Sequence, residues 1–170
     1  DLRAVFHHRR APIPGFARAD TLGRLKRRFD YIFEGKGGYP AILAGAELPD
    51  ALEVGATRIR VGDQPHGAIT SAGLRFEASG KSVGYSTDCN RLTPAMAELF
   101  AGVDVWVVDA LRRRPHPTHP NLEQALQWID VVRPGRAILT HMDNSMDYRT
   151  LAAELPDGVE PGFDGQEVEL

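Results

Sequence analysis

Residues 103–143 read VDVWVVDALRRRPHPTHPNLEQALQWIDVVRPGRAILTHMD, and they carry the clearest structural pattern in the chain. The run at residues 103–108 is nearly all β-branched or aromatic, which predicts a buried strand. Asn121 and Gln124 are spaced as a capping pair, and the apolar residues that follow keep helical spacing. A second apolar run at residues 137–140 predicts another buried strand. This strand–helix–strand order predicts a sheet covered by helices.

The segments before this stretch fit the same architecture. Residues 57–61 and 74–78 alternate apolar and polar side chains, which is typical of half-buried strands. A glycine-containing turn joins the second of them to residues 82–86, so we expect a β-hairpin there. Thr93 is followed by proline, and this pair predicts the cap and the first residue of a helix. We therefore expect one α/β (α+β) domain over residues 1–170.

The first forty residues show weaker signals. The prolines within residues 11–15 predict an extended chain, because each proline pushes its predecessor out of the helical region. Asp20 is placed to cap a short helix. Tyr31 and its aromatic neighbours flank a glycine-rich turn at residues 35–38, and a short apolar strand is expected at residues 41–43. The aromatic side chains form either a lid over a pocket or part of the core, and both alternatives stay open.

Composition limits the class of protein. The 170 residues are 42% apolar and 25% charged, which is typical of a globular domain. The net charge of -3 argues against nucleic acid or an anionic membrane as the main partner. The basic runs at residues 7–10 and 24–28 are either solvated surface or anion-steering groups. Cys89 is the only cysteine, which excludes a disulfide framework and a cysteine-rich zinc site and fits a cytoplasmic location. No apolar run approaches the roughly 20 residues of a membrane helix.

The histidines are the most informative polar residues. His66 follows a predicted strand, His116 and His119 lie in a proline-rich loop, and His141 ends a predicted strand, while Asp88 follows the hairpin. Loops at one edge of an α/β sheet are where such folds place their sites. Imidazole and carboxylate groups together suit zinc, manganese or iron. A histidine alone is more often a surface or hydrogen-bonded residue, so the residues by themselves leave a metal hydrolase and a structural role both open.

A series of short motifs narrows this choice: residues 84–88 (GYSTD), 109–112 (DALR) with His116 and His119, 139–142 (LTHM), 147–148 (DY) and 163–165 (FDG). Together they resemble successive motifs of hydrolases with the metallo-β-lactamase fold. They resemble in particular the phosphoribosyl cyclic phosphate phosphodiesterases and their relatives. The resemblance runs over residues 1–170. It implies an αββα sandwich and a hydrolase that uses a metal-activated water.

The resemblance assigns a role to individual residues. His66 matches the third histidine of the family's first metal site, and Asp88 matches the aspartate that bridges two metals. His141 matches the histidine that completes the second metal site. His119 matches the loop histidine that lies near the substrate phosphate, which makes it the expected general acid. His116 has no counterpart in the family and is expected beside the site or on the surface.

The resemblance also implies a chemistry. Two divalent metal ions, zinc or manganese, are expected to share Asp88 and to activate water against a small-molecule phosphodiester. Arg112 either contacts the phosphate or lies on the solvated surface. Alternatives are a thioester, lactone or β-lactam hydrolase on the same fold, and a non-catalytic module that has lost its metal motif. RNA processing is a weaker alternative because the chain lacks a strongly basic balance. A membrane partner is not expected, and a homodimer stays open.

One motif of the family is absent from the chain. The family's most specific signature, His-x-His-x-Asp-His, supplies most of the remaining metal ligands, and His7-His8 lacks its spacing. In the family this signature lies shortly before a segment that resembles residues 1–3. We therefore expect that the chain starts just after it and that an N-terminal portion of the domain is missing. Three ligands do not fill two metal sites, so the polypeptide as given is expected to be inactive or poor in metal.

Overall fold

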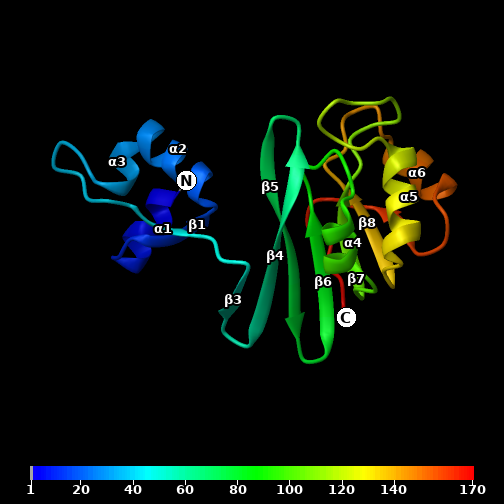
Figure 1. The fold of residues 1–170 in the computed structure, drawn as a ribbon, viewed down its shortest axis with the longest axis horizontal. Helices are drawn as coiled ribbons and strands as arrows, with labels where there is room; N and C mark the ends of the chain where they lie inside the picture. Colours follow the sequence, from blue (N-terminus) through cyan, green and yellow to red (C-terminus); the bar gives the residue numbers. More distant parts are fainter. Residues whose placement is uncertain (1) are drawn as a thin grey trace. The chain divides into compact units, whose positions relative to one another are not determined.

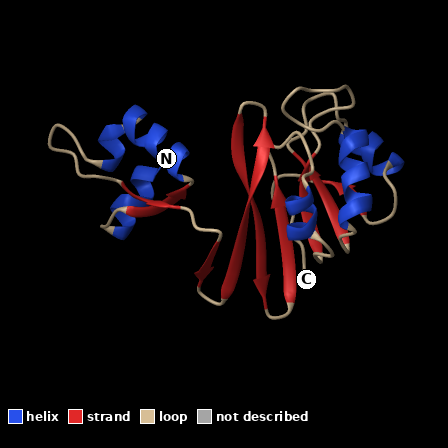
Figure 2. Cartoon of the chain, viewed as in Figure 1, coloured by secondary structure: helices blue, strands red, loops and turns tan. Residues whose placement is uncertain are grey.

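The computed structural model describes residues 2–170, which fall into two compact units with the boundary between Pro49 and Asp50. Both units mix helices and strands (Figures 1 and 2). The expectation of one domain over residues 1–170 stays a prediction. Within the described residues, none of the helices has the length and apolar character needed to cross a membrane.

The first unit is a small α/β arrangement around a pair of parallel strands. Strands β1 and β2 pair in parallel, with Ile13 opposite Leu43 and Ala17 opposite Glu47. Leu22 and Phe33 pack where β2 carries Gly45, because a Cβ at Gly45 would lie 2.9 Å from Leu22 Cδ1 and 2.8 Å from Phe33 Cε1. The elements are α1 (Leu2–Arg9), β1 (Ile13–Ala17), α2 (Ala19–Arg28), α3 (Asp30–Phe33) and β2 (Leu43–Glu47).

Two sequence-based expectations for this unit need correction, and one segment has a structure for which no prediction was made. The first three residues of the basic run at residues 7–10 form the end of α1, where positive side chains favour the helix dipole. Asp20 does not cap α2, because the helix begins one residue earlier and Asp20 lies in its first turn. The apolar strand expected at residues 41–43 begins at Leu43 and continues to Glu47.

The second unit contains a seven-stranded sheet whose strands follow one another in sequence order from β3 to β9. Strands β3 to β6 pair antiparallel, and β6 to β9 pair in parallel. Figure 1 shows β4 and β6 pointing the same way and β5 pointing the opposite way. The strands are β3 (Ala51–Val54), β4 (Thr57–His66), β5 (Ile69–Ala78), β6 (Lys81–Ser86), β7 (Val105–Asp109), β8 (Arg136–Thr140) and β9 (Val159–Pro161).

Helices of the second unit pack their apolar sides onto alternate residues of the central strands. The helices are α4 (Pro94–Phe100), α5 (Leu122–Val132) and α6 (Tyr148–Glu154). Trp106 and Leu139 of the sheet join Phe100, Trp128 and Leu151 of the helices in one buried cluster. Phe100 and Trp106 stack with their ring centroids 5.5 Å apart. The predicted α/β fold with a helix-covered sheet is therefore confirmed.

Local sequence signals explain where these helices begin. The Thr93 side chain accepts a hydrogen bond from the Met96 backbone, and Pro94 is the first helical residue of α4, as predicted. Asn121 and Gln124 form the predicted reciprocal capping box at the start of α5. Helix α5 ends at Val132, and the next residue, Arg133, caps it in the left-handed conformation just before a proline.

Candidate metal centre

Four strands of the second unit end at the same edge of the sheet. Strands β6, β7 and β8 are parallel, and β4 runs the same way because two antiparallel pairings separate it from β6. His66 is the last residue of β4, and Asp109 is the last residue of β7. Asp88 and His141 follow β6 and β8 within two residues. The loop of residues 110–121 lies at this end of the sheet (Figure 1), and its His119 bonds Asp109 there.

The backbone is unusual at two of these positions. Asp88 has a φ of 56° and His141 a φ of 60°, so both adopt the left-handed conformation. Aspartate and histidine tolerate this conformation better than most residues, but it is uncommon outside glycine. Strained backbone of this kind is typical of functional sites, where it directs a side chain out of the strand. Here it turns the Asp88 carboxylate toward two imidazoles.

The Asp88 carboxylate lies between His66 and His141. Its Oδ1 atom is 3.7 Å from His66 Nε2 and 3.9 Å from His141 Nε2. Two ligands of one tetrahedral zinc ion, each about 2.0–2.1 Å from it, lie roughly 3.4 Å apart. The observed separations exceed this value by a few tenths of an ångström. A carboxylate in this position can therefore share a cation with either imidazole after a small side-chain movement.

The hydrogen bond of His66 fixes which ring nitrogen faces the site. Its Nδ1 atom lies 3.0 Å from the Thr118 carbonyl oxygen, which only accepts hydrogen bonds. The proton of a neutral His66 ring therefore sits on Nδ1, and the lone pair sits on Nε2. A backbone carbonyl that orients the far nitrogen is the usual support of a metal-binding histidine. The Nε2 atom that faces Asp88 is thus prepared to bind a cation.

His119 is held by a buried carboxylate that the sequence did not single out. Its Nδ1 atom donates to Asp109 Oδ2 at 2.8 Å, and its side chain is only 11% exposed. The same Oδ2 atom accepts the backbone N–H of Asp88 at 2.9 Å. One carboxylate therefore positions both the expected acid and the expected bridging ligand. Asp109 appeared only within a motif, and its place as the charged last residue of a buried strand was the signal that could have identified it.

The environment of Asp109 is largely non-aqueous. Burial raises its pKa above the ordinary value of 3.8, and the hydrogen bond from His119 acts in the opposite direction. Its Oδ1 atom is buried and has no hydrogen-bond partner within residues 2–170. A buried carboxylate oxygen without a partner is costly, and it favours a positive group close by.

His119 also lies at the centre of a group of imidazoles. Its ring centroid is 4.8 Å from that of His66, 4.7 Å from that of His141 and 5.2 Å from that of His116. Two sets of three potential ligands result, each with its ligand atoms within 4.8 Å of one another. They are His66, Asp88 and His119, and Asp109, His119 and His141. This mixture of imidazole and carboxylate donors fits a divalent cation such as zinc or manganese.

A network of buried polar side chains holds the Asp88 loop. Gln64 is fully buried, and its Oε1 atom accepts the Ser86 hydroxyl at 2.6 Å, while its Nε2 atom donates to the Thr87 carbonyl at 3.0 Å. The Ser71 hydroxyl donates to the Asp88 carbonyl at 2.7 Å. Gly73 makes room for this network, because a Cβ there would lie 2.6 Å from Gln64 Oε1. The position of Asp88 is therefore fixed by β4 and β5 as well as by its own strand.

The remaining loop residues have different roles. The guanidinium of Arg112 donates to the carbonyl oxygens of Arg114 at 3.3 Å and Pro115 at 3.0 Å, so it braces the loop. Its expected contact with a phosphate stays a prediction. Arg113 pairs with Glu154 instead. Burial and, to a lesser extent, the charge of Arg112 lower the pKa of His116, which favours a neutral ring beside His119.

Comparison with known proteins shows which family the chain matches. The sequence model of the family described as "Beta-lactamase superfamily domain" matches residues 1–142. An octanoyltransferase of Porphyromonas gingivalis is 25% identical over 173 residues, which include 98% of this chain. The match covers 34% of that protein, so this chain spans about a third of its curated relative.

Solved structures show the same fold. A diphosphatase of the PhnP family superposes with a TM-score of 0.81 and 27% identity, over 94% of this chain and 59% of that protein. The zinc-bound PqqB protein of Methylobacterium extorquens has a TM-score of 0.73 at 17% identity, over 94% and 66% of the two chains. The short form of human tRNase Z has a TM-score of 0.62 at 13% identity, over 91% and 66%.

Proposed function

Because this chain belongs to the beta-lactamase superfamily and has the metallo-β-lactamase fold of its hydrolases, we propose that it is a metal-dependent phosphodiesterase of small molecules. The observation that carries this proposal is the Asp88 carboxylate placed between His66 Nε2 and His141 Nε2, beside a histidine held by a buried carboxylate. The similarity to a PhnP-family diphosphatase, at 27% identity, favours attack at phosphorus. The chain covers 59% of that diphosphatase, so the activity proposed is that of the complete polypeptide.

Three residues are proposed as metal ligands: His66, Asp88 and His141. Two zinc or manganese ions bound there would polarise a phosphoryl oxygen and lower the pKa of a water molecule toward neutrality. Asp88 would be the ligand shared by both ions, and this assignment is supported by its Oδ1 atom, which faces one imidazole on each side. Three side chains do not complete two coordination shells, so further ligands have to join them.

His119 is proposed as the general acid. Its Nδ1 atom is engaged by Asp109 at 2.8 Å, so the proton that it transfers is the one on Nε2. The Asp109 carboxylate holds the ring in one orientation through this hydrogen bond. A positioned acid of this kind contributes typically about 10²–10⁴-fold to the rate by protonating the leaving oxygen. Asp109 is a positioning residue in this scheme, because it acts through His119.

Metal analysis of variants separates the ligands from the acid. In the complete polypeptide, His66→Ala, Asp88→Ala and His141→Ala should each lower the metal stoichiometry. His119→Ala should lower the turnover of a phosphodiester with an alkoxide leaving group, which needs a proton to depart, and leave the metal content largely intact. His116→Ala is the matched control, since its ring has no bond to Asp109. Unchanged metal content in all three ligand variants would refute the proposed metal site.

Substrate screening tests the reaction class. The phosphodiester should be hydrolysed much faster than a thioester, a lactone or a β-lactam, because the similarity to a PhnP-family diphosphatase favours attack at phosphorus. Preferential hydrolysis of an acyl substrate would contradict the phosphodiesterase assignment and identify an acyl hydrolase that uses the same metal ligands. Metal binding without hydrolysis of any of these substrates would favour a non-catalytic module.

A further inference from the structure

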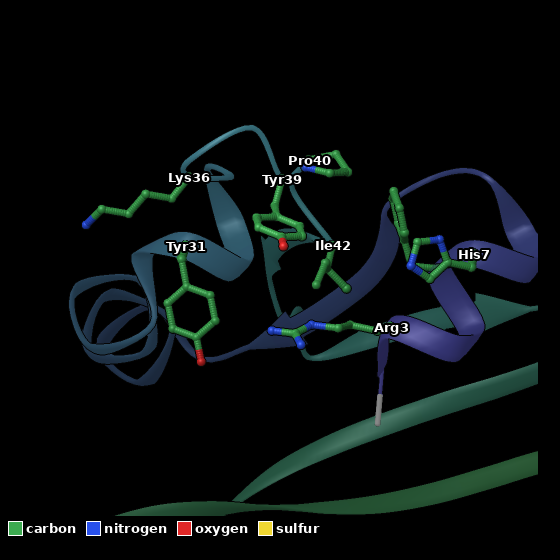
Figure 3. A pocket seen from close by; sticks show the side chains of 8 residues that line it. Arg3, His7, Tyr31, Lys36, Tyr39, Pro40 and Ile42 are labelled. Atoms are coloured by element: carbon green, nitrogen blue, oxygen red, sulfur yellow. The ribbon is translucent and has the colours of Figure 1, made fainter.

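The first unit contains a pocket that none of the metal-centre residues lines. It has a volume of about 310 Å³ and lies between α1, α3 and the chain that leads into β2. Figure 3 shows Tyr31, Tyr39 and Ile42 on one side and Arg3 and His7 on the other. Pockets for small molecules have volumes of roughly 300–1,000 Å³ and combine an apolar or aromatic lining with a few polar groups. This pocket has both properties and lies at the small end of the range.

A tight hairpin sets the position of Tyr39 at the pocket. Lys36 and Tyr39 exchange both backbone hydrogen bonds, each with an N···O distance of 3.1 Å. Gly37 and Gly38 between them have φ values of 60° and 85°, as a two-residue hairpin turn requires. Gly35 is needed as well, because a Cβ there would lie 2.5 Å from the Tyr39 carbonyl oxygen. The ring is therefore placed by backbone geometry that glycine alone adopts readily.

The exposure of Tyr39 distinguishes a binding role from core packing. Its side chain is 80% exposed, although the hairpin that carries it is tightly made. Tyr31 is 42% exposed on the same side of the pocket. Phe33, in contrast, packs against β2 at Gly45. Of the aromatic residues near the glycine-rich turn, Phe33 thus packs against β2, and the two tyrosines remain exposed at the pocket.

Positive charge faces these rings. Figure 3 shows Arg3 reaching below Ile42 toward Tyr31, and His7 directed at the pocket from the same helix. An arginine carries five N–H donors, so it can serve a ligand together with another partner. Lys36 extends away from the pocket, and its ammonium lies 3.5 Å from the Asp30 carboxylate. Among the described residues that line the pocket none is acidic.

The charge of the whole unit reinforces this local pattern. Residues 1–49 contain nine lysine and arginine residues and five aspartate and glutamate residues, a net charge of +4. Residues 50–170 contain eleven basic and eighteen acidic residues, a net charge of -7. The near-neutral total of the chain therefore conceals a cationic unit. Such a field raises the local concentration of anionic ligands.

We propose that this pocket binds a small molecule in which a planar aromatic ring carries a phosphate monoester, as in a nucleoside monophosphate. The ring lies against Tyr39, and the phosphate meets the Arg3 guanidinium, whose planar fork suits phosphate oxygens. His7 adds a further donor to the phosphate. The pocket does not involve His66, Asp88 or His141, so this site stands or fails independently of the proposed hydrolase activity.

Calorimetric titration of the complete polypeptide, freed of metal with EDTA, tests the site. Adenosine 5′-monophosphate is the probe, and adenosine and ribose 5-phosphate supply the ring and the phosphate separately. We expect sub-millimolar binding of the nucleotide, at least roughly tenfold tighter than either part alone. Tyr39→Ala should weaken the binding of the nucleotide and leave the binding of ribose 5-phosphate unchanged. Arg3→Gln should weaken the binding of both the nucleotide and ribose 5-phosphate and leave the binding of adenosine unchanged.

Matched controls distinguish specific binding in the pocket from general electrostatic attraction to the positively charged unit. Arg24→Gln removes one positive charge from an exposed pair with Asp20 outside the pocket, and it should change nucleotide binding by less than about twofold. Tyr148→Ala removes a half-exposed tyrosine from the second unit and should leave nucleotide binding unchanged. Equal losses of nucleotide affinity in Arg24→Gln and Arg3→Gln would show that the nucleotide is held by non-specific electrostatic attraction and not by the pocket. Binding of 4-hydroxybenzoate as tight as that of the nucleotide would overturn the requirement for phosphate.

A measurement on the unaltered protein keeps the proposal testable if a variant does not fold. Titration of the nucleotide should shift the ring resonances of Tyr31 and Tyr39 in the NMR spectrum and leave those of Tyr85 and Tyr148 in place. Absence of nucleotide binding by the metal-free polypeptide would overturn the proposal. So would binding that shifts only the resonances of the second unit.

Discussion

Substitution of Asp109 by asparagine separates catalytic positioning from metal binding. The Oδ2 atom of Asp109 accepts one hydrogen bond from His119 at 2.8 Å and one from the Asp88 backbone at 2.9 Å. Asparagine keeps the shape but has one acceptor oxygen and no charge. The variant therefore loses the charge-assisted bond that orients His119, a bond worth about 1.5–3 kcal/mol.

That free energy converts directly into an expected rate. At about 1.4 kcal/mol per factor of ten, loss of the bond lowers kcat by roughly 10- to 150-fold. Complete loss of general-acid catalysis sets the upper limit at about 10⁴-fold. The metal content should not change, because Asp109 is assigned no metal ion. Steady-state kinetics with a phosphodiester that has an alkoxide leaving group and elemental analysis of the same sample give both quantities.

The pH dependence of stability in the metal-free protein is an independent test of the burial of Asp109. Burial raises the pKa of Asp109 above 3.8, so the folded chain retains a proton that the unfolded chain has already released. Its contribution to the free energy of unfolding is fully present below pH 3.8 and falls as the pH rises through the folded-state pKa. Asp109→Asn removes this pH dependence, which denaturant titrations at several pH values detect.

Asp104→Asn is the matched control for this experiment. Asp104 also bonds a neighbouring strand, through the Ser82 backbone and hydroxyl, but it lies at the opposite end of β7 from His119. It should leave kcat unchanged. An unchanged kcat in Asp109→Asn would refute the positioning role. A joint fall in kcat and metal content would identify Asp109 as a ligand instead, in the set that it forms with His119 and His141.

Three further predictions concern the scaffold. Burial raises the pKa of the Cys89 thiol to about 12, so it should react with Ellman's reagent at pH 8 only after unfolding, and rapid reaction of the folded protein would contradict its burial. Gly73→Ala should lower the free energy of unfolding by about 1–3 kcal/mol through overpacking against Gln64, whereas Gly23→Ala in exposed helix α2 should raise it by about 0.5–1 kcal/mol. Asn121→Ala removes the capping box of α5 and should cost about 1 kcal/mol in chemical denaturation, with no loss indicating that water replaces the cap.

Much of the second unit could be predicted because its signals are local. The capping box at Asn121 and the proline after Thr93 each act within one helical turn, and both are present in the structure. Strand β4 was predicted to end near residue 61, but it continues to His66 because pairing with β5 persists to Ile69. Pairing of this kind depends on another strand, so the periodicity of a single segment does not define its length.

The site was predictable only in part for the same reason. His66, Asp88 and His141 occupy strand ends, which the sequence indicates, and the family resemblance supplied their roles. Asp109 lies in an apolar strand, and its importance depends on two partners, His119 and the Asp88 backbone, that the fold brings to it. The network around Gln64 was missed because each of its bonds joins residues from different strands. Tertiary contacts of this type leave no periodic signal.

Metal analysis of the complete polypeptide tests the central claim most directly. Elemental analysis after purification without added metal should give about two equivalents of zinc or manganese per chain. The Asp88→Ala variant should lose most of this metal, because its carboxylate faces both His66 and His141. Absence of metal, even after reconstitution with zinc and with manganese, would contradict the proposed hydrolase. Only the fold of the chain would then remain established, and the histidines would have a structural role.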